Sequence, residues 1–169
     1  MKIRTVKSTD YQNLYTFIQI AFSTAEVKDG TEQDFVLNLR AGDTFIPELE
    51  FIAEEDHEII GHIMMTKQSI QLEDGILTGV LVAPLCVDIN HRHQGIGQAL
   101  MHYAHKRALE MGYTTSFLVG NPDYYGRFGY RQTNEFNIIN DSDIPNQFVL
   151  ACELIPNALK NIKGKIMIH

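Results

Sequence analysis

The sequence predicts an α+β fold, in which a mixed sheet carries helices on its faces. Three observations predict it. The chain has 169 residues, 44% hydrophobic and 21% charged, as in ordinary globular proteins. Apolar segments separated by short polar turns fill residues 49–87 and predict hairpins. The pattern then changes to strand, helix and strand. No linker interrupts the chain, so we expect one domain over residues 1–169.

The first forty residues predict a strand and two helices. Residues 3–7 form the strand, and Thr9 with Gln12 has the spacing of a capping box. A second helix begins at Thr31 and ends at Gly42. The apolar residues of the first helix follow the three- and four-residue spacing of one helical face: Leu14, Phe17, Ile18, Ala21 and Phe22.

The next segment predicts three strands. Residues 49–54 and 59–72 flank a polar turn at 55–58. The sequence Glu-Asp-Gly at 73–75 is a hairpin signal. Residues 78–87 are nearly all apolar, as expected of a central strand that is buried on both faces.

A helix and a further strand follow. The helical pattern runs from Ile96 to Met111 and stops at Gly112. Residues 114–119 predict a strand. Asn121 before Pro122 is typical of a helix start, where the asparagine caps and the proline takes the first position.

The C-terminal part predicts short elements. The helix after Asn121 ends at Gly129, and strands are expected near 130–133 and 147–154. The tail, 156–169, predicts a turn of helix and a last strand. That strand could complete the sheet of its own chain or pair with another copy, so a homodimer stays open.

Charge and composition exclude several classes of function. Acidic residues number 21 against 14 basic ones, a formal charge of -7, which disfavours nucleic acid and anionic membranes as partners. The longest apolar run, 80–87, is too short to span a membrane, and the N-terminus lacks a signal-peptide pattern. Cys86 and Cys152 form no CxxC pair, and no histidine spacing fits a metal. We therefore expect a cytoplasmic protein without a metal.

The segment Arg92–Gly97, RHQGIG, joins the apolar strand to the helix. Its two glycines remove side chains where a backbone must come close to a ligand. The N–H groups of the first helical turn favour an anion, usually a phosphate. The string lacks the Lys-Ser/Thr of a P-loop, and Leu100 stands where a dinucleotide fingerprint needs glycine.

Arg-x-x-Gly-x-Gly after an apolar strand resembles the acyl-CoA-binding motif of the GNAT superfamily of N-acetyltransferases. The later segment NPDYYGRFGY, Asn121–Tyr130, is similar to that family's tyrosine-bearing helix before Gly-aromatic. Together these motifs cover residues 84–130. The resemblance implies a mostly antiparallel sheet of six or seven strands with about four helices. The sheet would splay between the strand of 85–87 and the strand that ends near Val119.

The resemblance also implies a site for acetyl-CoA as acyl donor. Its pantetheine arm would pair with the backbone of the apolar strand, and its pyrophosphate would lie on the amides of the loop. The thioester would point at the helix that begins after Asn121. The implied cofactor-binding residues are Leu85, Cys86, Val87, Arg92, His93, Gln94, Gly95, Ile96, Gly97, Gln98 and Asn121.

The implied activity is direct transfer of the acetyl group to a primary amine of a small molecule or protein. Tyr125, five residues before Tyr130, is expected to act as general acid toward the CoA thiolate. The residues leave the general base open among Glu54, Glu55 and His62. Two alternatives also stay open: a module that binds acyl-CoA without turnover, and a Gly-x-Gly that is only a tight turn.

Overall fold

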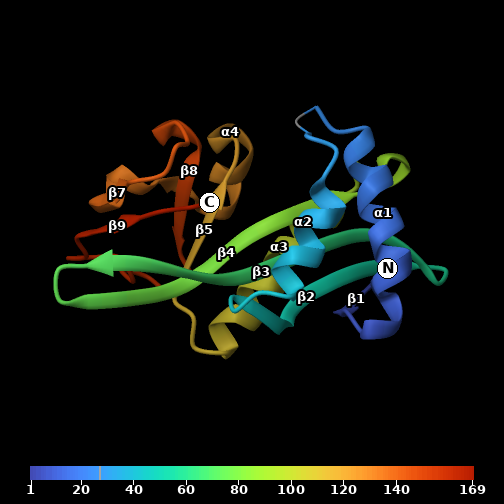
Figure 1. Ribbon diagram of the computed structural model, residues 1–169, viewed down its shortest axis with the longest axis horizontal. Coiled ribbons are helices and arrows are strands. Elements are labelled where there is room, and N and C mark those ends of the chain that lie inside the picture. Colours follow the sequence, from blue (N-terminus) through green and yellow to red (C-terminus); the bar gives the residue numbers. More distant parts are fainter. Residues whose placement is uncertain (27) are drawn as a thin grey trace. The chain divides into compact units, whose positions relative to one another are not determined.

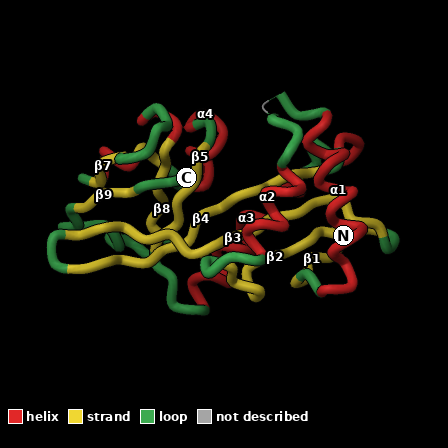
Figure 2. Tube along the Cα trace, in the orientation of Figure 1, coloured by secondary structure: helices red, strands yellow, loops and turns green. Residues whose placement is uncertain are grey.

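The computed structural model describes residues 1–26 and 28–169. In those ranges the four α-helices are α1 (Tyr11–Ser23), α2 (Glu32–Arg40), α3 (Ile96–Glu110) and α4 (Pro122–Tyr125). The strands are β1 (Lys2–Thr5), β2 (Phe45–Glu55), β3 (Glu58–Leu72), β4 (Gly75–Val87), β5 (Thr115–Val119), β6 (Arg131–Gln132), β7 (Ile138–Asn140), β8 (Val149–Glu153) and β9 (Gly164–Ile166). Figure 2 distinguishes helices, strands and loops along the chain.

The strands form a mixed, mostly antiparallel sheet, which confirms the expected fold class. They are hydrogen-bonded in the order β1-β2-β3-β4-β5-β8-β6, and β9 pairs with β3 and β7. The parallel pairs are β4 with β5 and β7 with β9. Over the described residues the sheet has nine strands rather than six or seven. The difference comes from the tail, because β9 pairs within its own chain and brings β7 into the sheet.

Contacts divide the chain into two compact units. Unit 1 comprises Met1–Thr66 and Ala83–Ala104. In it, β1 pairs with β2 and β2 with β3, both antiparallel, and α1 and α2 run beside these strands (Figure 1). Side chains alternate between the two faces of a strand. One face therefore buries Ile52 and Met64 under α1 and α2.

The opposite face of unit 1 packs against α3. A Cβ added at Gly61 would lie 2.8 Å from Leu100 Cδ1 and 3.1 Å from Ile96 Cγ2, so α3 approaches β3 closely at this glycine. Phe51 meets Tyr103 edge-on, with 5.0 Å between ring centroids. This contact fixes α3, and with it the loop that precedes α3, on the sheet.

Unit 2 comprises Lys67–Val82 and His105–His169. Its β5 pairs in parallel with β4, at Val80–Ser116 and Leu81–Phe117, and antiparallel with β8. Buried apolar side chains from the strands and the tail form its core: Ile70, Phe117, Phe136, Ile138, Val149, Ala151, Leu159, Ile166 and Ile168. The tail is therefore a structural part of this unit.

Several boundaries differ from expectation. Thr9 does not cap α1, because it lies in a 3-10 turn, and the helix begins at Tyr11. The Asp10 carboxylate accepts the Lys7 N–H there, at 2.8 Å. β2 begins at Phe45, ahead of the expected start at 49, across a register shift. The strand expected near 130–133 shortens to two residues and is followed by a 3-10 turn.

Candidate functional site

The loop between β4 and α3 presents backbone donors. His93 and Gly95 have φ angles of 62° and 81°, in the left-handed region. Within residues 1–26 and 28–169, no acceptor meets the backbone N–H groups of residues 93–98. A Cβ at Gly95 would have no heavy atom within 4 Å, so the space beside it is open. Successive free N–H groups at a helix start form a concave site for an anion.

Side chains of unit 1 hold this loop in place. The Asp88 carboxylate accepts the Asn90 N–H at 3.1 Å and the His91 Nδ1–H at 2.7 Å. The Arg92 guanidinium donates to Val87 O at 3.2 Å, Ala21 O at 2.9 Å and Thr24 Oγ1 at 2.9 Å. Arg92 Nη2 is therefore directed to the C-terminal end of α1, and Nε to the end of β4.

A half-buried tyrosine, Tyr125, ends the short helix α4 in unit 2. Asn121 Oδ1 accepts the Asp123 N–H at 2.9 Å, which confirms Asn121 as N-cap, with Pro122 in the first turn. The Tyr125 ring lies over Gly120, where an added Cβ would be 2.4 Å from ring atom Cε2. Burial raises the pKa of the Tyr125 hydroxyl to about 12. The hydroxyl therefore keeps its proton at neutral pH.

The profile of the Acetyltransferase (GNAT) domain matches residues 2–133 of the 169. The chain belongs to the GNAT acetyltransferase family. It is 34% identical over 83 residues to the uncharacterized N-acetyltransferase YhbS of Escherichia coli K12 (48% of each chain). It is 31% identical over 100 residues to YjhQ of the same strain (59% of this chain, 55% of YjhQ). The match spans about half the length of these curated relatives.

Solved GNAT structures share the fold. The crystal structure of Escherichia coli YhbS in complex with CoA has a TM-score of 0.86 at 22% identity, over 99% of this chain and 89% of that one. A GNAT acetyltransferase from Brucella melitensis in complex with acetyl-CoA has a TM-score of 0.77 at 21% identity, over 99% and 95%. At these identities the likeness shows the fold.

The predicted residues of the GNAT motifs fall into two groups. Leu85–Val87 end β4, and Arg92–Gln98 form the loop and first turn of α3, all in unit 1. Asn121 and Tyr125 share α4 and its cap in unit 2. The sequence did not indicate that Gly120 makes room for the Tyr125 ring. Its position directly before the Asn-Pro helix start was the available signal.

His62, one of the three candidates for the general base in this GNAT domain, belongs to a buried network. Arg40 Nη2 and His62 Nε2 donate to Glu50 Oε1, at 2.5 Å and 2.9 Å. The Glu50 and His62 side chains are 1% and 0% exposed. Burial lowers the pKa of His62 and outweighs the carboxylate beside it. Burial alone would raise the pKa of Glu50, but hydrogen bonds from His62 and Arg40 prevail and lower it.

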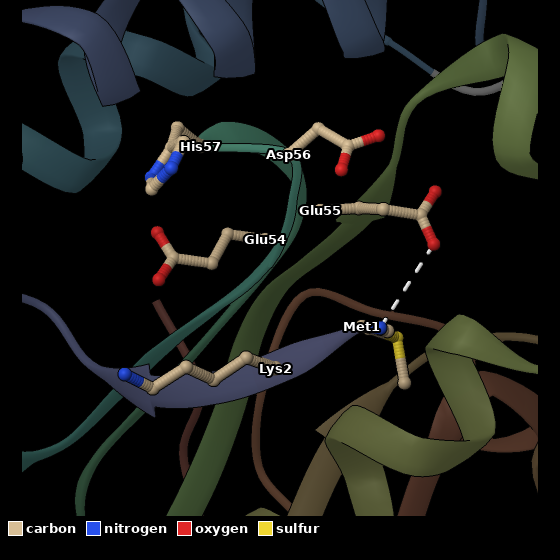
Figure 3. Close-up of a pocket in the computed structure, with 6 residues that line it drawn as sticks. All are labelled: Met1, Lys2, Glu54, Glu55, Asp56 and His57. Carbon is tan, nitrogen blue, oxygen red and sulfur yellow. Dashed lines mark ion pairs between the residues drawn. The ribbon is translucent and has the colours of Figure 1, made fainter.

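The other two candidates, Glu54 and Glu55, are the last two residues of β2, directly before the turn to β3. Figure 3 shows their side chains pointing to opposite sides of the strand. Both residues line an open hollow of about 510 Å³. Glu54 accepts from Arg4 Nε at 3.1 Å. Glu55 lies 3.9 Å from the Met1 amine and 3.6 Å from His91 Nε2. Each carboxylate is thus balanced by a cation or histidine of the chain.

The buried pair predicts a loss of stability in acid. Since the pKa of His62 is lowered by folding, the unfolded chain binds the extra proton as the pH falls below about 6.5. The lowered pKa of Glu50 acts in the same direction at lower pH. We expect the Tm to fall as the pH is lowered from 7 to 5. In His62→Gln we expect a smaller fall of the Tm over the same pH range. Thermal melts followed by circular dichroism measure the change of Tm with pH, and His57→Gln, at an exposed histidine, is the control. An equal change of Tm in wild type and His62→Gln would contradict the prediction.

The two cysteines are buried thiols. Burial raises the pKa of Cys86 to about 12 and that of Cys152 to about 11. Neither carries the thiolate that covalent acyl transfer would need. In the described part of the chain no group of three or more His, Cys, Asp or Glu side chains is arranged to hold a metal. Across the same residues, none of the helices has the length and apolar character to cross a bilayer.

Proposed function

We propose that this GNAT domain is an N-acetyltransferase that moves an acetyl group from acetyl-CoA to a primary amine. The observation that carries the proposal is the loop of residues 93–98, whose N–H groups meet no acceptor among the described residues and in which His93 and Gly95 have left-handed φ angles. Family membership supports it, as do the CoA and acetyl-CoA in the structures of YhbS and the Brucella melitensis enzyme. When bound, acetyl-CoA supplies an activated acetyl thioester.

The chain's own geometry fits such a donor. The backbone amides of residues 93–98 would bind the pyrophosphate, since they combine free donors with the positive end of α3. Among the described residues the β4–β5 ladder consists of Val80 and Leu81 with their partners. Leu85, Cys86 and Val87 form no pair with β5 there. We propose that their backbone binds the pantetheine arm.

Tyr125 would act as the general acid. Its pKa of about 12 keeps the hydroxyl protonated at neutral pH, so Tyr125 can donate to the sulfur that leaves. A thiolate in a dry site is more basic than one in water, which favours this donation. The amine must also lose a proton before attack. An ordinary lysine-like pKa near 10.4 puts this cost at about 4–5 kcal/mol at pH 7.

The general base stays a prediction among Glu54, Glu55 and His62. His62 is enclosed and hydrogen-bonded to Glu50, so it would need a water path to reach an amine. The net charge of -7 favours a cationic acceptor. We also propose a cytoplasmic location, because both cysteines are unpaired.

Calorimetric titration with acetyl-CoA tests the proposal, with NADH and ATP as controls. We expect saturable binding of acetyl-CoA alone. An amine panel assayed by release of the CoA thiol then tests turnover. Binding without turnover across the panel would favour the non-catalytic acyl-CoA module. Absence of binding at about 1 mM, equivalent to about 4 kcal/mol, would reject the acetyl-CoA site.

Arg92 is proposed to support the cofactor loop through α1 rather than as a phosphate ligand. In Arg92→Gln we expect the Kd for acetyl-CoA to rise only a few-fold, with an unchanged dependence on salt. In the absence of ligand, backbone amides at the end of α1, such as that of Ala25, should exchange hydrogen faster in Arg92→Gln than in the wild-type protein. Titration at several salt concentrations and hydrogen exchange measure both effects. A large loss of affinity with a shallower salt dependence would instead show a direct contact with phosphate.

A further inference from the structure

The half-buried Tyr125 ring packs against several neighbours in unit 2. Gly120 lies in contact with one face of the ring, which leaves no room for a Cβ at that position. The Tyr124 ring meets it edge-on, with centroids 4.9 Å apart and an interplanar angle of 86°. The Tyr130 ring meets it at 6.1 Å and 73°. The orientation of Tyr125 therefore depends on where Tyr130 lies.

The backbone returns Tyr130 to this position through a tight turn. Gly129 takes a φ of 89°, which a side-chain-bearing residue rarely adopts. The Tyr130 N–H then reaches back to Tyr125 O at 3.4 Å. The turn brings the two rings together, but it does not fix the tilt of either ring.

The Tyr130 hydroxyl is held by two further elements of the unit. It lies 2.6 Å from Ser116 Oγ of β5 and 2.7 Å from His105 Nε2 of α3. Tyr130 is 1% exposed, and burial raises its pKa well above the ordinary value. Two hydrogen bonds from separate elements restrain the far end of the ring, while the turn restrains its near end.

We propose that Tyr130 is a positioning residue for the transfer reaction: its hydroxyl, held between Ser116 and His105, keeps the Tyr125 ring in one orientation. The inference rests on the proposed function, in which Tyr125 donates the proton. A hydroxyl that donates to a leaving sulfur must be well placed, and a misplacement of about 1 Å can cost about a hundredfold in rate. Tyr130 acts through Tyr125 and need not touch acetyl-CoA.

Tyr130→Phe tests the proposal, because it keeps the ring and removes the hydroxyl. We expect kcat to fall about tenfold, with the KM and Kd for acetyl-CoA within about twofold of wild type. In a Tyr125→Phe background the same change should have no further effect on kcat. His105→Ala should lower kcat as Tyr130→Phe does, whereas His105→Gln, whose amide can also hydrogen-bond to the Tyr130 hydroxyl, should keep most of the wild-type kcat.

Tyr103→Phe is the matched control, since it removes a tyrosine hydroxyl from a ring that packs on Phe51 in unit 1. It should keep wild-type kcat. Wild-type kcat in Tyr130→Phe, beside an impaired Tyr125→Phe, would overturn the positioning role and leave the proposed function intact. An equal loss from Tyr130→Phe in both backgrounds would overturn it too, because the residue would then act independently of Tyr125.

A readout without turnover separates failure of this inference from failure of the proposed function. The chain has seven tyrosines, and ring NMR of the labelled protein identifies Tyr125 by the signal lost in Tyr125→Phe. In Tyr130→Phe we expect that signal to shift or broaden. An unchanged Tyr125 signal would overturn the inference whether or not an amine acceptor has been found.

Discussion

Gly95→Glu is expected to abolish acetyl-CoA binding. A side chain at a φ of 81° costs about 1–3 kcal/mol, and the new carboxylate would enter the open space beside the N–H groups of residues 93–98. There it would occupy the donors and repel a pyrophosphate. We expect no measurable heat of binding at acetyl-CoA concentrations up to about 1 mM. For a wild-type Kd of about 10 μM, this corresponds to a loss of affinity of at least about a hundredfold.

Two variants separate the causes of this loss. Gly95→Ala carries the backbone strain without the charge and meets no atom within 4 Å, so it should weaken binding only several-fold. Gly112→Glu carries both strain and charge at the other end of α3, where φ is 95° and the space is open. It should keep wild-type affinity. Wild-type affinity in Gly95→Glu would reject the loop as the pyrophosphate site.

Tyr125→Phe is expected to lower kcat by about a hundredfold, in the range of general acid catalysis. The acetyl-CoA Kd should stay within a few-fold, because phenylalanine keeps the ring over Gly120 and against Tyr130. Since the pKa of Tyr125 is about 12, wild-type kcat should show no loss from this group between pH 7 and pH 10. Steady-state kinetics with an identified amine, over that pH range, measures both effects.

Tyr124→Phe is the control for that experiment. Tyr124 is adjacent in sequence but 36% exposed, and its ring meets Arg127 at 4.5 Å. It should retain wild-type kcat. Full activity in Tyr125→Phe would show that another donor protonates the sulfur, while the N-acetyltransferase proposal would stand.

Most elements could be predicted from the sequence, but the shortest strands could be predicted only in part or not at all. The apolar spacing of α1 and α3, and the hairpin of β3 and β4, follow from local pattern. β6 was expected as a strand of four residues and has two, and β7, whose three residues are too few to show a period, was not expected. Their place in the sheet depends on pairing with β8 and β9, which lie elsewhere in the sequence.

The same distinction holds for the candidate site. Loop residues 92–97 and the Asn121 cap are local signals, and the glycine spacing was readable. Contacts between residues that are distant in the sequence could not be predicted from it. Arg92 reaches Ala21 across 71 positions, and His62 meets Glu50 only because the β2–β3 register brings them together. Tyr130 and His105 are 25 positions apart on different elements.

The burial of both cysteines has a consequence for assay chemistry. Cys86 and Cys152 are 8% and 5% exposed, with pKa values raised to about 12 and about 11. Aromatic disulfide reagents react with thiolates, so the folded protein should consume almost none of the reagent at pH 7–8. The colour that develops in such an assay then comes from the thiol of the coenzyme released by turnover. A slow development of colour without an amine acceptor would indicate that the protein unfolds and exposes its cysteines.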